Sequence, residues 1–397
     1  MTRPFINTIF TILLFSFGCN TPVENSTSLD TGVEQLQAGE IDFQSKKIIA
    51  AADQYLSKSP VTITDFPSPR SAGGIHDYYS EGAYWWENSE DPNGPYIRKD
   101  GRRNPNNFDH HKNALRELST IVTTLTAAYQ LTNDPKYAHQ AVEHIRAWFV
   151  NEKTRMNPNL LYAQAIKGIN TGRGIGIIDT LRLINVALSI EFLEQQNILV
   201  NQDLAGTKKW FNDFSEWLTT HPYGHDERDN NNNHSTWWGA QVAAFARVAD
   251  REDILKISQE QFKKQLTIQM EKDGSFPHEL ERTKPFHYTN YTLRGWTSYA
   301  HLASTPSENL WAYNSKNGTL QKAVEFAIPF YKNPEKWPYL TDLEKEIHLH
   351  RNDFLILAHW GLDKMEYVNM WNSLDENLKD NDEGDANLII WENEFSK

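Results

Sequence analysis

Two short stretches of the sequence carry side chains suited to acid–base chemistry beside a bound anion. The first is the run of four asparagines at 230–233, which is followed directly by His234. Consecutive asparagines disfavour a helix, so we expect one to begin just after them, near Ser235 or Thr236. Free backbone N–H groups there attract an anion, Asn233 can donate to it without adding charge, and His234 can exchange a proton near neutral pH. Taken alone, the run is also typical of a helix cap and a solvated turn.

The second stretch, residues 277–291, reads PHELERTKPFHYTNY and follows the turn Asp273-Gly274. It places Arg282 six residues before Tyr288, just ahead of an expected helix. Arginine offers a fixed pair of donors to a carboxylate, and a tyrosine beside it is expected to ionise more easily than in water. The same pattern is also typical of a surface loop whose tyrosines pack under a helix.

The combination of the two stretches is more specific than either one. NNHSTW, followed about fifty residues later by ELER and then YTNY, resembles the alginate lyase family of polysaccharide lyases. The resemblance implies catalytic roles for four residues, Asn233, His234, Arg282 and Tyr288. Two features depart from the family pattern: the spacing from Arg282 to Tyr288 is one residue shorter, and Thr289 replaces an expected histidine. These departures indicate a separate branch and leave the substrate preference open.

The reaction that the resemblance implies is β-elimination in a polyuronate, above all alginate. Such an enzyme removes the weakly acidic C5 proton and expels the sugar linked at C4. Because that proton lies next to a carboxylate anion, the charge has to be neutralised, which is the role we expect for Asn233 and Arg282. Tyr288 could be both base and acid at mannuronate, whereas at guluronate His234 could be the base and Tyr288 the acid. No cofactor and no metal is required.

Three alternatives remain compatible with the sequence. A related lyase could act on glucuronan or another uronan. A glycoside hydrolase on the same fold needs two carboxylates across the scissile bond, and the sequence offers Asp226, Glu227 and Glu279. A surface lipoprotein that only binds glycans would keep the aromatic residues, but it would have no use for a tyrosine and a histidine beside an arginine.

Further residues could bind an acidic sugar. The segment TGRGIG at 171–176 lacks the spacing and the preceding strand of a dinucleotide-binding loop, but it could present Arg173 to a carboxylate. Trp85 and Trp237 offer flat faces on which sugars stack, and the run IRKDGRR at 97–103 adds positive charge. A helix–helix loop at 171–176 and aromatic residues in the core are the competing interpretations.

The composition restricts the possible partners. A net charge of −13 argues against nucleic acid and against an anionic membrane surface. An acidic polysaccharide therefore needs a local basic cleft. Separately, we expect the protein to be a monomer. The histidines at 110, 111, 221 and 225 do not share one helix face or form an HExxH motif, so we expect hydrogen-bonded or surface histidines and no metal site.

The elements that position these residues are expected to be almost entirely helical. After residue 110 the apolar residues recur with helical spacing, and Asn133-Asp134-Pro135 predicts a tight turn between helices at 115–129 and 137–149. The pattern indicates an all-α fold, an (α/α) toroid of about six or seven antiparallel pairs over residues 46–365, with 60–108 as a long ordered loop. Further helices are expected at about 177–195, 206–220, 235–249, 252–270, 290–304, 318–333 and 339–360.

The two ends of the chain differ from this pattern. Residues 1–18 resemble a lipoprotein-type signal peptide, and Cys19, the only cysteine, stands where a lipid anchor would be attached. A plain signal peptide cut nearby is the alternative. We expect 19–45 to be a flexible tether and 366–397 to be an acidic, solvated segment. The protein is thus expected to be exported, as a periplasmic or outer-membrane-anchored lipoprotein of a bacterium.

Overall fold

The apolar periodicity of the sequence corresponds to helices in the computed structural model, which describes residues 41, 43–375 and 385–395. Helices α2 (His110–Thr132) and α3 (Pro135–Phe149) form the expected hairpin. Asn133 ends α2 in the left-handed conformation (φ 56°), and the Asp134 carboxylate accepts a hydrogen bond from the backbone N–H of Lys136. The predicted turn is confirmed, together with the chemistry on which it was based.

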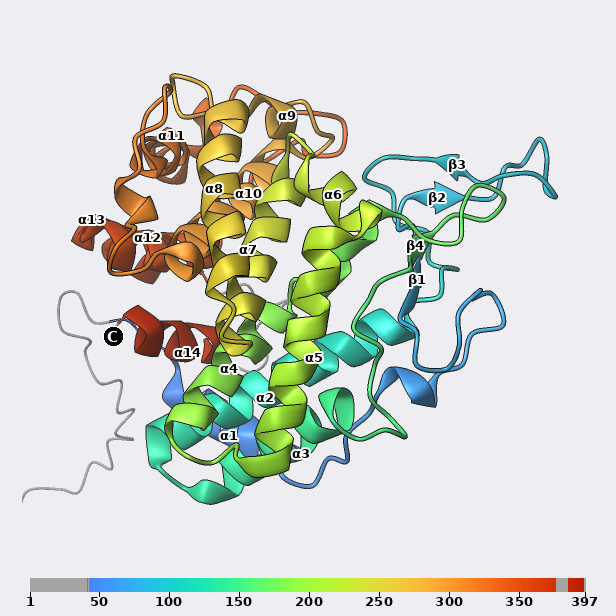
Figure 1. The fold of residues 1–397 in the computed structure, drawn as a ribbon. Helices are drawn as coiled ribbons and strands as arrows, with labels where there is room; N and C mark the ends of the chain where they lie inside the picture. The colour runs from blue at the N-terminus through green and yellow to red at the C-terminus, as the bar shows by residue number, and fades with distance from the viewer. Residues whose placement is uncertain (1–40, 42, 376–384, 396–397) are drawn as a thin grey trace, which may run out of the picture. The chain divides into compact units, whose positions relative to one another are not determined.

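The contacts between helices describe two layers around a ring. Figure 1 shows the labelled helices and strands. In the inner layer each helix packs against the next, and α14 returns to α2 and α4. Each outer helix packs against an inner one, so the all-α toroid is confirmed. Besides α2, the inner helices are α4 (Leu183–Gln195), α7 (Asn233–Val248), α10 (Pro285–Ala303), α12 (Asp353–Leu362) and α14 (Ala386–Phe395). Besides α3, the outer ones are α1 (Ser45–Tyr55), α5 (Asn201–Thr220), α8 (Glu252–Gln269), α11 (Leu320–Lys332) and α13 (Met365–Asn372).

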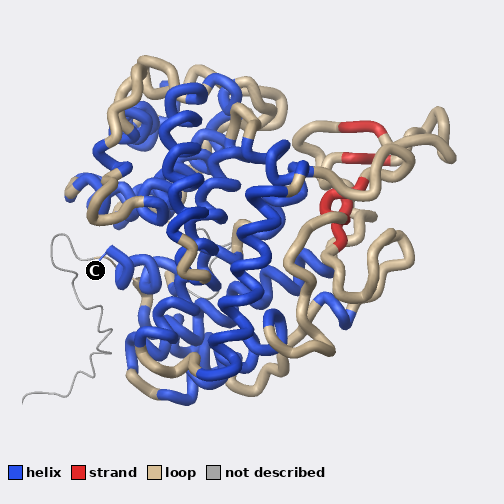
Figure 2. The backbone as a smooth tube through the Cα atoms, in the orientation of Figure 1, coloured by secondary structure: helices blue, strands red, loops and turns tan. Residues whose placement is uncertain are grey.

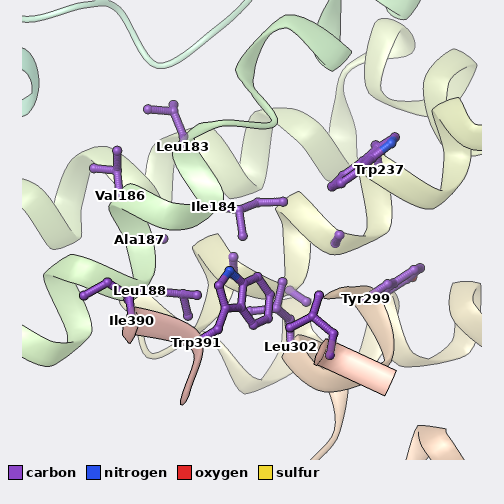
Figure 3. Close-up of a cluster of buried hydrophobic side chains, with 14 of the residues drawn as sticks. Leu183, Ile184, Val186, Ala187, Leu188, Trp237, Tyr299, Leu302, Ile390 and Trp391 are labelled. Carbon is purple, nitrogen blue, oxygen red and sulfur yellow. The ribbon is translucent and has the colours of Figure 1, made fainter. Parts of the chain in front are cut away.

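The position of a helix in the ring follows from the distribution of its apolar residues. Nearly every residue of α4 and α7 is buried, as expected for helices that are apolar on all sides. The outer helices α3 and α5 bury one face and expose the other. Figure 3 shows the core where α4, α7, α10 and α14 meet around Leu188, Trp237, Tyr299 and Trp391.

Glycine allows α7 and α10 to approach each other closely. A Cβ atom on Gly239 would lie 2.0 Å from the Tyr299 ring, and one on Gly295 would lie 3.1 Å from the Thr236 side chain. Position 236 thus faces 295 and position 239 faces 299, so the two helices run parallel. Their first turns therefore lie at the same end of the ring.

The segment 60–108 is an ordered loop with short strands that the sequence did not predict. Strand β1 (Tyr79–Glu81) pairs in parallel with β4 (Tyr162–Ala165), and β2 (Trp85–Trp86) pairs antiparallel with β3 (Ile97–Arg98). The strands gather on one side of the helices (Figure 2), beside the short helix α6 (Pro222–Arg228). The remaining short elements are α9 (Pro277–Leu280), η1 (Ile63–Asp65), η2 (Gly174–Thr180), η3 (Leu310–Ala312) and η4 (Pro334–Lys336).

The predicted helix at 339–360 is wrong in its first part, because only α12 is helical there. The non-helical residues 339–352 include Glu344, which contacts the first turn of α10. The Glu344 carboxylate accepts hydrogen bonds from the backbone N–H groups of Phe286 (2.6 Å) and His287 (3.0 Å), in the first turn of α10. A negative charge at that position satisfies free donors and complements the helix dipole, so a tertiary contact outweighs the local helical pattern.

The expectation of a solvated segment after residue 365 is also wrong for the described residues. Helices α13 and α14 lie there, with Trp371 and Trp391 in the core. Apolar residues at helical spacing outweigh the acidic composition, so the toroid extends to α14. The signal peptide at 1–18, Cys19 and the tether up to residue 40 lie outside the described residues. None of the described helices is both long enough and apolar enough to span a bilayer.

Candidate active site

Helix α7 begins with the two residues singled out in the asparagine run. It starts at Asn233, two residues before the predicted start, and the Asn232 side chain caps it by accepting a hydrogen bond from the His234 backbone N–H (3.1 Å). One asparagine of the run is thus an ordinary helix cap. Asn233 and His234 occupy the first turn, so the helix backbone sets the direction of both side chains.

Asn233 is held by a buried carboxylate. Its backbone N–H donates to Glu279 Oε1 (2.7 Å), and its side-chain Nδ2 lies 2.9 Å from each Glu279 oxygen. Glu279, in α9, is 1% exposed. Burial raises its pKa, while the bonds from Asn233 and the charges of Arg282 and His234 act in the opposite direction. These contacts fix which end of the Asn233 amide carries the nitrogen.

His234 is held by a second buried carboxylate. Its Nδ1 lies 2.7 Å from Glu227 Oε1, at the end of α6. The Glu227 side chain is 0% exposed, whereas 19% of the His234 side chain is exposed. Burial raises the pKa of Glu227, and the contact with His234 lowers it. With Glu227 ionised, Nδ1–H donates to it and Nε2 carries the free lone pair of a neutral imidazole.

Arg282 and Tyr288 form a pair, as their spacing suggested. Tyr288 lies in the first turn of α10 and is 9% exposed. Arg282 Nη2 donates to the Tyr288 hydroxyl (2.7 Å), and the guanidinium lies 3.8 Å from the centre of the Tyr288 ring. The Tyr84 hydroxyl, just before β2, lies 3.2 Å from the Tyr288 hydroxyl, a partner that the sequence did not suggest.

The expectation that Tyr288 ionises more easily than in water is wrong for this structure. Burial and the contact with Tyr84 raise the pKa of Tyr288 above its usual value, and the opposing effect of Arg282 is smaller. The arginine acts in the expected direction, but removal of the phenol from water outweighs it. Tyr288 is therefore a proton donor in the resting protein.

The β2–β3 segment reaches across to this pair. Asp100, just after β3, lies 3.4 Å from Arg282 Nη2 and accepts a hydrogen bond from the Thr283 hydroxyl (3.3 Å). Together with Tyr84, Asp100 links the strand side of the site to the start of α10. The site therefore lies between the ends of α7 and α10 and the strands.

Arg173 lies near the same residues. Its Nε donates to the Gln164 backbone carbonyl and its Nη2 to the Gln164 side chain, both at 3.0 Å, and its guanidinium lies 5.9 Å from the Trp85 ring centre. Burial lowers the pKa of Arg173 to about 10, and the charge of Glu227 acts against that shift. No carboxylate of the described residues lies within 4.0 Å of it. Arg173 is thus a largely buried cation without a paired carboxylate.

The two tryptophans that were candidates for sugar stacking differ. Trp85 is partly exposed beside Arg173. Trp237 is 2% exposed and packs against Tyr291, with ring centres 5.3 Å apart. The stacking role predicted for Trp237 is therefore wrong, because its position on the face of α7 toward α10 places the ring in the core.

Three of the four histidines considered as metal ligands contact the backbone, and the fourth, His110, stacks on Phe66 with ring centres 5.2 Å apart. His111 Nδ1 accepts from the Tyr79 N–H (2.9 Å), and His225 Nε2 lies 2.9 Å from the Thr219 carbonyl. His221 caps α6. Within the described ranges no group of three or more His, Cys, Asp and Glu side chains could hold a metal ion.

Comparison with known proteins agrees with this arrangement. Residues 62–337 match the model of the family named Alginate lyase. The chain belongs to the alginate lyase family. An alginate lyase from Bacteroides ovatus is 30% identical, with a TM-score of 0.75 over 87% of this chain and 92% of that one. Alginate lyase A1-III from a Sphingomonas species is similar in fold, at 17% identity and a TM-score of 0.55 over 81% of this chain and 89% of that one.

One further structure is a variant of alginate lyase A1-III complexed with a tetrasaccharide, at 16% identity and a TM-score of 0.57 over 84% of this chain and 90% of that one. The search of curated proteins finds no match. The family and the fold show that the protein is a polysaccharide lyase whose partner is an acidic polysaccharide.

Proposed function

We propose that this lyase cleaves alginate by β-elimination, with Asn233 and Arg282 at the substrate carboxylate and with His234 and Tyr288 as the acid–base pair. The observation that carries the proposal is the contact between Arg282 and the Tyr288 hydroxyl at the start of α10, in register with the first turn of α7. A charge-neutralising group and a proton donor thus contact each other at the start of α10.

The chemistry begins at the uronate carboxylate. Arg282 binds one side of it and Asn233 the other, so that negative charge developing at C5 and the carboxylate is stabilised. A base takes the C5 proton, a double bond forms between C4 and C5, and the bond from C4 to the linking oxygen breaks. The leaving oxygen takes a proton from the acid. The products are a new chain end and a 4,5-unsaturated sugar.

The two uronates of alginate require different bases. In mannuronate the C5 proton and the C4 oxygen lie on the same face, so Tyr288, once its hydroxyl has lost its proton to solvent, serves as base and then as acid. In guluronate they lie on opposite faces, and His234 takes the proton while Tyr288 protonates the leaving oxygen. The second route begins with a protonated Tyr288, the state that its raised pKa favours.

The surroundings suit an anionic polymer on an otherwise acidic protein. Four basic side chains, Arg98, Lys99, Arg102 and Arg103, are exposed on and after β3, within eight residues that contain one acidic side chain. Arg173 adds a partly buried cation beside the partly exposed Trp85. We assign Arg173 to a second sugar carboxylate and Trp85 to a sugar ring face.

The hydrolase alternative conflicts with the positions of two of its three candidate carboxylates, which leaves only the exposed Asp226. Glu227 and Glu279 are fully buried and already bound to His234 and Asn233. A hydrolase needs both carboxylates at the scissile bond. Here the two buried carboxylates instead hold the side chains of His234 and Asn233.

The experiment that tests the proposal is near-ultraviolet absorbance during incubation of the protein with defined polymers. The set is polymannuronate, polyguluronate, glucuronan, hyaluronan and a neutral glucan, each with and without chelator. A rise on an alginate polymer that chelator does not change is expected. A rise on glucuronan alone moves the substrate to that polymer, and new reducing ends without absorbance would contradict elimination.

The proposal includes an exported, monomeric protein anchored through a lipid on Cys19, which rests on the sequence of residues 1–19 alone. A Cys19→Ser variant of the full chain is expected to move from the membrane fraction to the soluble fraction of its host. Unchanged membrane association would refute the anchor, and a dimer mass in light scattering would refute the monomer.

A further inference from the structure

The carboxylate of Glu227 has no direct part in the elimination described above, although its burial costs free energy. Its side chain is fully buried, and a buried carboxylate persists only with good partners. Two partners are present: His234 Nδ1 at 2.7 Å from Oε1 and Asn230 Nδ2 at 3.2 Å from Oε2. The shorter contact is the one to the catalytic imidazole.

A carboxylate in this position determines which nitrogen of the imidazole can react. By accepting a hydrogen bond from Nδ1–H, Glu227 holds the tautomer with the lone pair on Nε2. It also holds the ring in one orientation, since α7 fixes the backbone of His234. When Nε2 takes a proton, the imidazolium that forms lies 2.7 Å from a negative charge and is stabilised by it.

The other charged and titratable groups around Glu227 do not duplicate this role. Arg173, ahead of η2, and His234, on α7, lower its pKa, and Asp179, in η2, acts in the opposite direction. Tyr291, on α10, is buried with its own pKa raised, so it stays neutral. The imidazole is the only one of these groups in contact with the Glu227 carboxylate among the described residues.

We propose that Glu227 is a positioning residue that acts through His234 and gives the enzyme its ability to cleave at guluronate. This inference rests on the proposed function, in which His234 is the base for guluronate and Tyr288 alone serves mannuronate. Glu227 therefore determines which uronate is cleaved without touching the substrate. Glu279, which holds Asn233, affects both uronates because both need their carboxylate neutralised.

The test compares polyguluronate and polymannuronate as substrates of a Glu227→Gln variant. The amide permits the wrong imidazole tautomer and removes the charge, so kcat on polyguluronate should fall at least about 10-fold, and at most by the roughly 10²–10⁴-fold that a general base contributes. The KM on polyguluronate and the kcat on polymannuronate should change less than about 2-fold. The matched control is Asp229→Asn, at an exposed carboxylate that directly follows α6. It should leave kcat unchanged on both polymers.

A double-mutant cycle separates positioning from a general loss of structure. In a His234→Ala background, Glu227→Gln should cause no further loss on polyguluronate, because its effect passes through the imidazole. An equal loss on both polymers, or an additive loss in the double variant, would overturn the proposal. If the glutamine variant does not fold, Glu227→Asp, which retains the charge but withdraws it from Nδ1, should show the same selective loss.

The inference and the proposed function fail in different ways. If the unmodified protein produces no absorbance on either alginate polymer, the proposed function is wrong. If it cleaves both polymers and Glu227→Gln retains the original ratio of the two rates, the function stands and the role of Glu227 is wrong.

Discussion

Replacement of Tyr288 by phenylalanine tests the centre of the proposed mechanism. The ring and its stacking under the Arg282 guanidinium remain, and only the hydroxyl is lost, together with its contacts to Arg282 and Tyr84. Arg282 retains Asp100 at 3.4 Å, and Tyr84 is partly exposed to water, so neither partner is left buried without a bond. The free energy of unfolding should therefore fall by only about 1–2 kcal/mol.

The kinetic effect should be much larger than the effect on stability. Tyr288 is the acid for both uronates, and a positioned acid or base contributes about 10²–10⁴-fold. At about 1.36 kcal/mol for each factor of ten, this loss corresponds to about 2.7–5.4 kcal/mol of transition-state stabilisation. The assay is the initial rate of near-ultraviolet absorbance on polymannuronate and on polyguluronate, with binding of a non-cleaved oligosaccharide measured by calorimetry.

The reasoning predicts that kcat collapses on both polymers while the oligosaccharide binds within a few-fold of its original affinity. A variant that retains more than a tenth of the original kcat on either polymer would show that another group protonates the leaving oxygen. Loss of binding together with kcat would show that the hydroxyl acts through Arg282 to hold the substrate.

Four other outcomes follow from the structure. Glu279→Gln disturbs the amide that it holds, so KM should rise on both alginate polymers in the absorbance assay, and a rise on only one would contradict that role. Arg173→Met removes a partly buried cation with no paired carboxylate among the described residues, so the melting temperature should stay level or rise while polymer affinity falls, as calorimetry can measure. Gly239→Ala places a methyl group 2.0 Å from the Tyr299 ring, so urea unfolding should show a loss of about 1–3 kcal/mol. Burial raises the pKa of Tyr299 and Tyr331, so the unfolded chain loses those protons first, and the free energy of unfolding should fall as the pH rises above about 10.

Much of the fold could be predicted because it depends on local rules. The hairpin around Asn133 and Asp134 follows from capping and from proline at the start of α3. The inner helices follow from their uniformly apolar composition. The helix predicted at 339–352 fails because Glu344 is used to cap α10, a contact between segments far apart in the sequence. No local pattern contains that information.

The candidate site likewise contains residues that could be predicted from the sequence and residues that could not. The four candidate catalytic residues could be named because their types and their order along the chain match a family pattern. The carboxylates that hold two of them could not be given roles, because Glu227 and Glu279 are ordinary acidic residues until folding buries them against His234 and Asn233. Trp237 was misassigned because the sequence does not show which face of α7 turns toward α10.

The contact of α14 with α2 and α4 has a consequence for biosynthesis. A ribosome delivers α2 long before α14, so the apolar surface that Ile389 and Trp391 cover stays exposed until α14 is translated. The nascent protein therefore exposes an aggregation-prone apolar surface until α14 packs against α2 and α4. A premature stop codon anywhere before residue 386 would leave this surface exposed and produce a chain prone to aggregation.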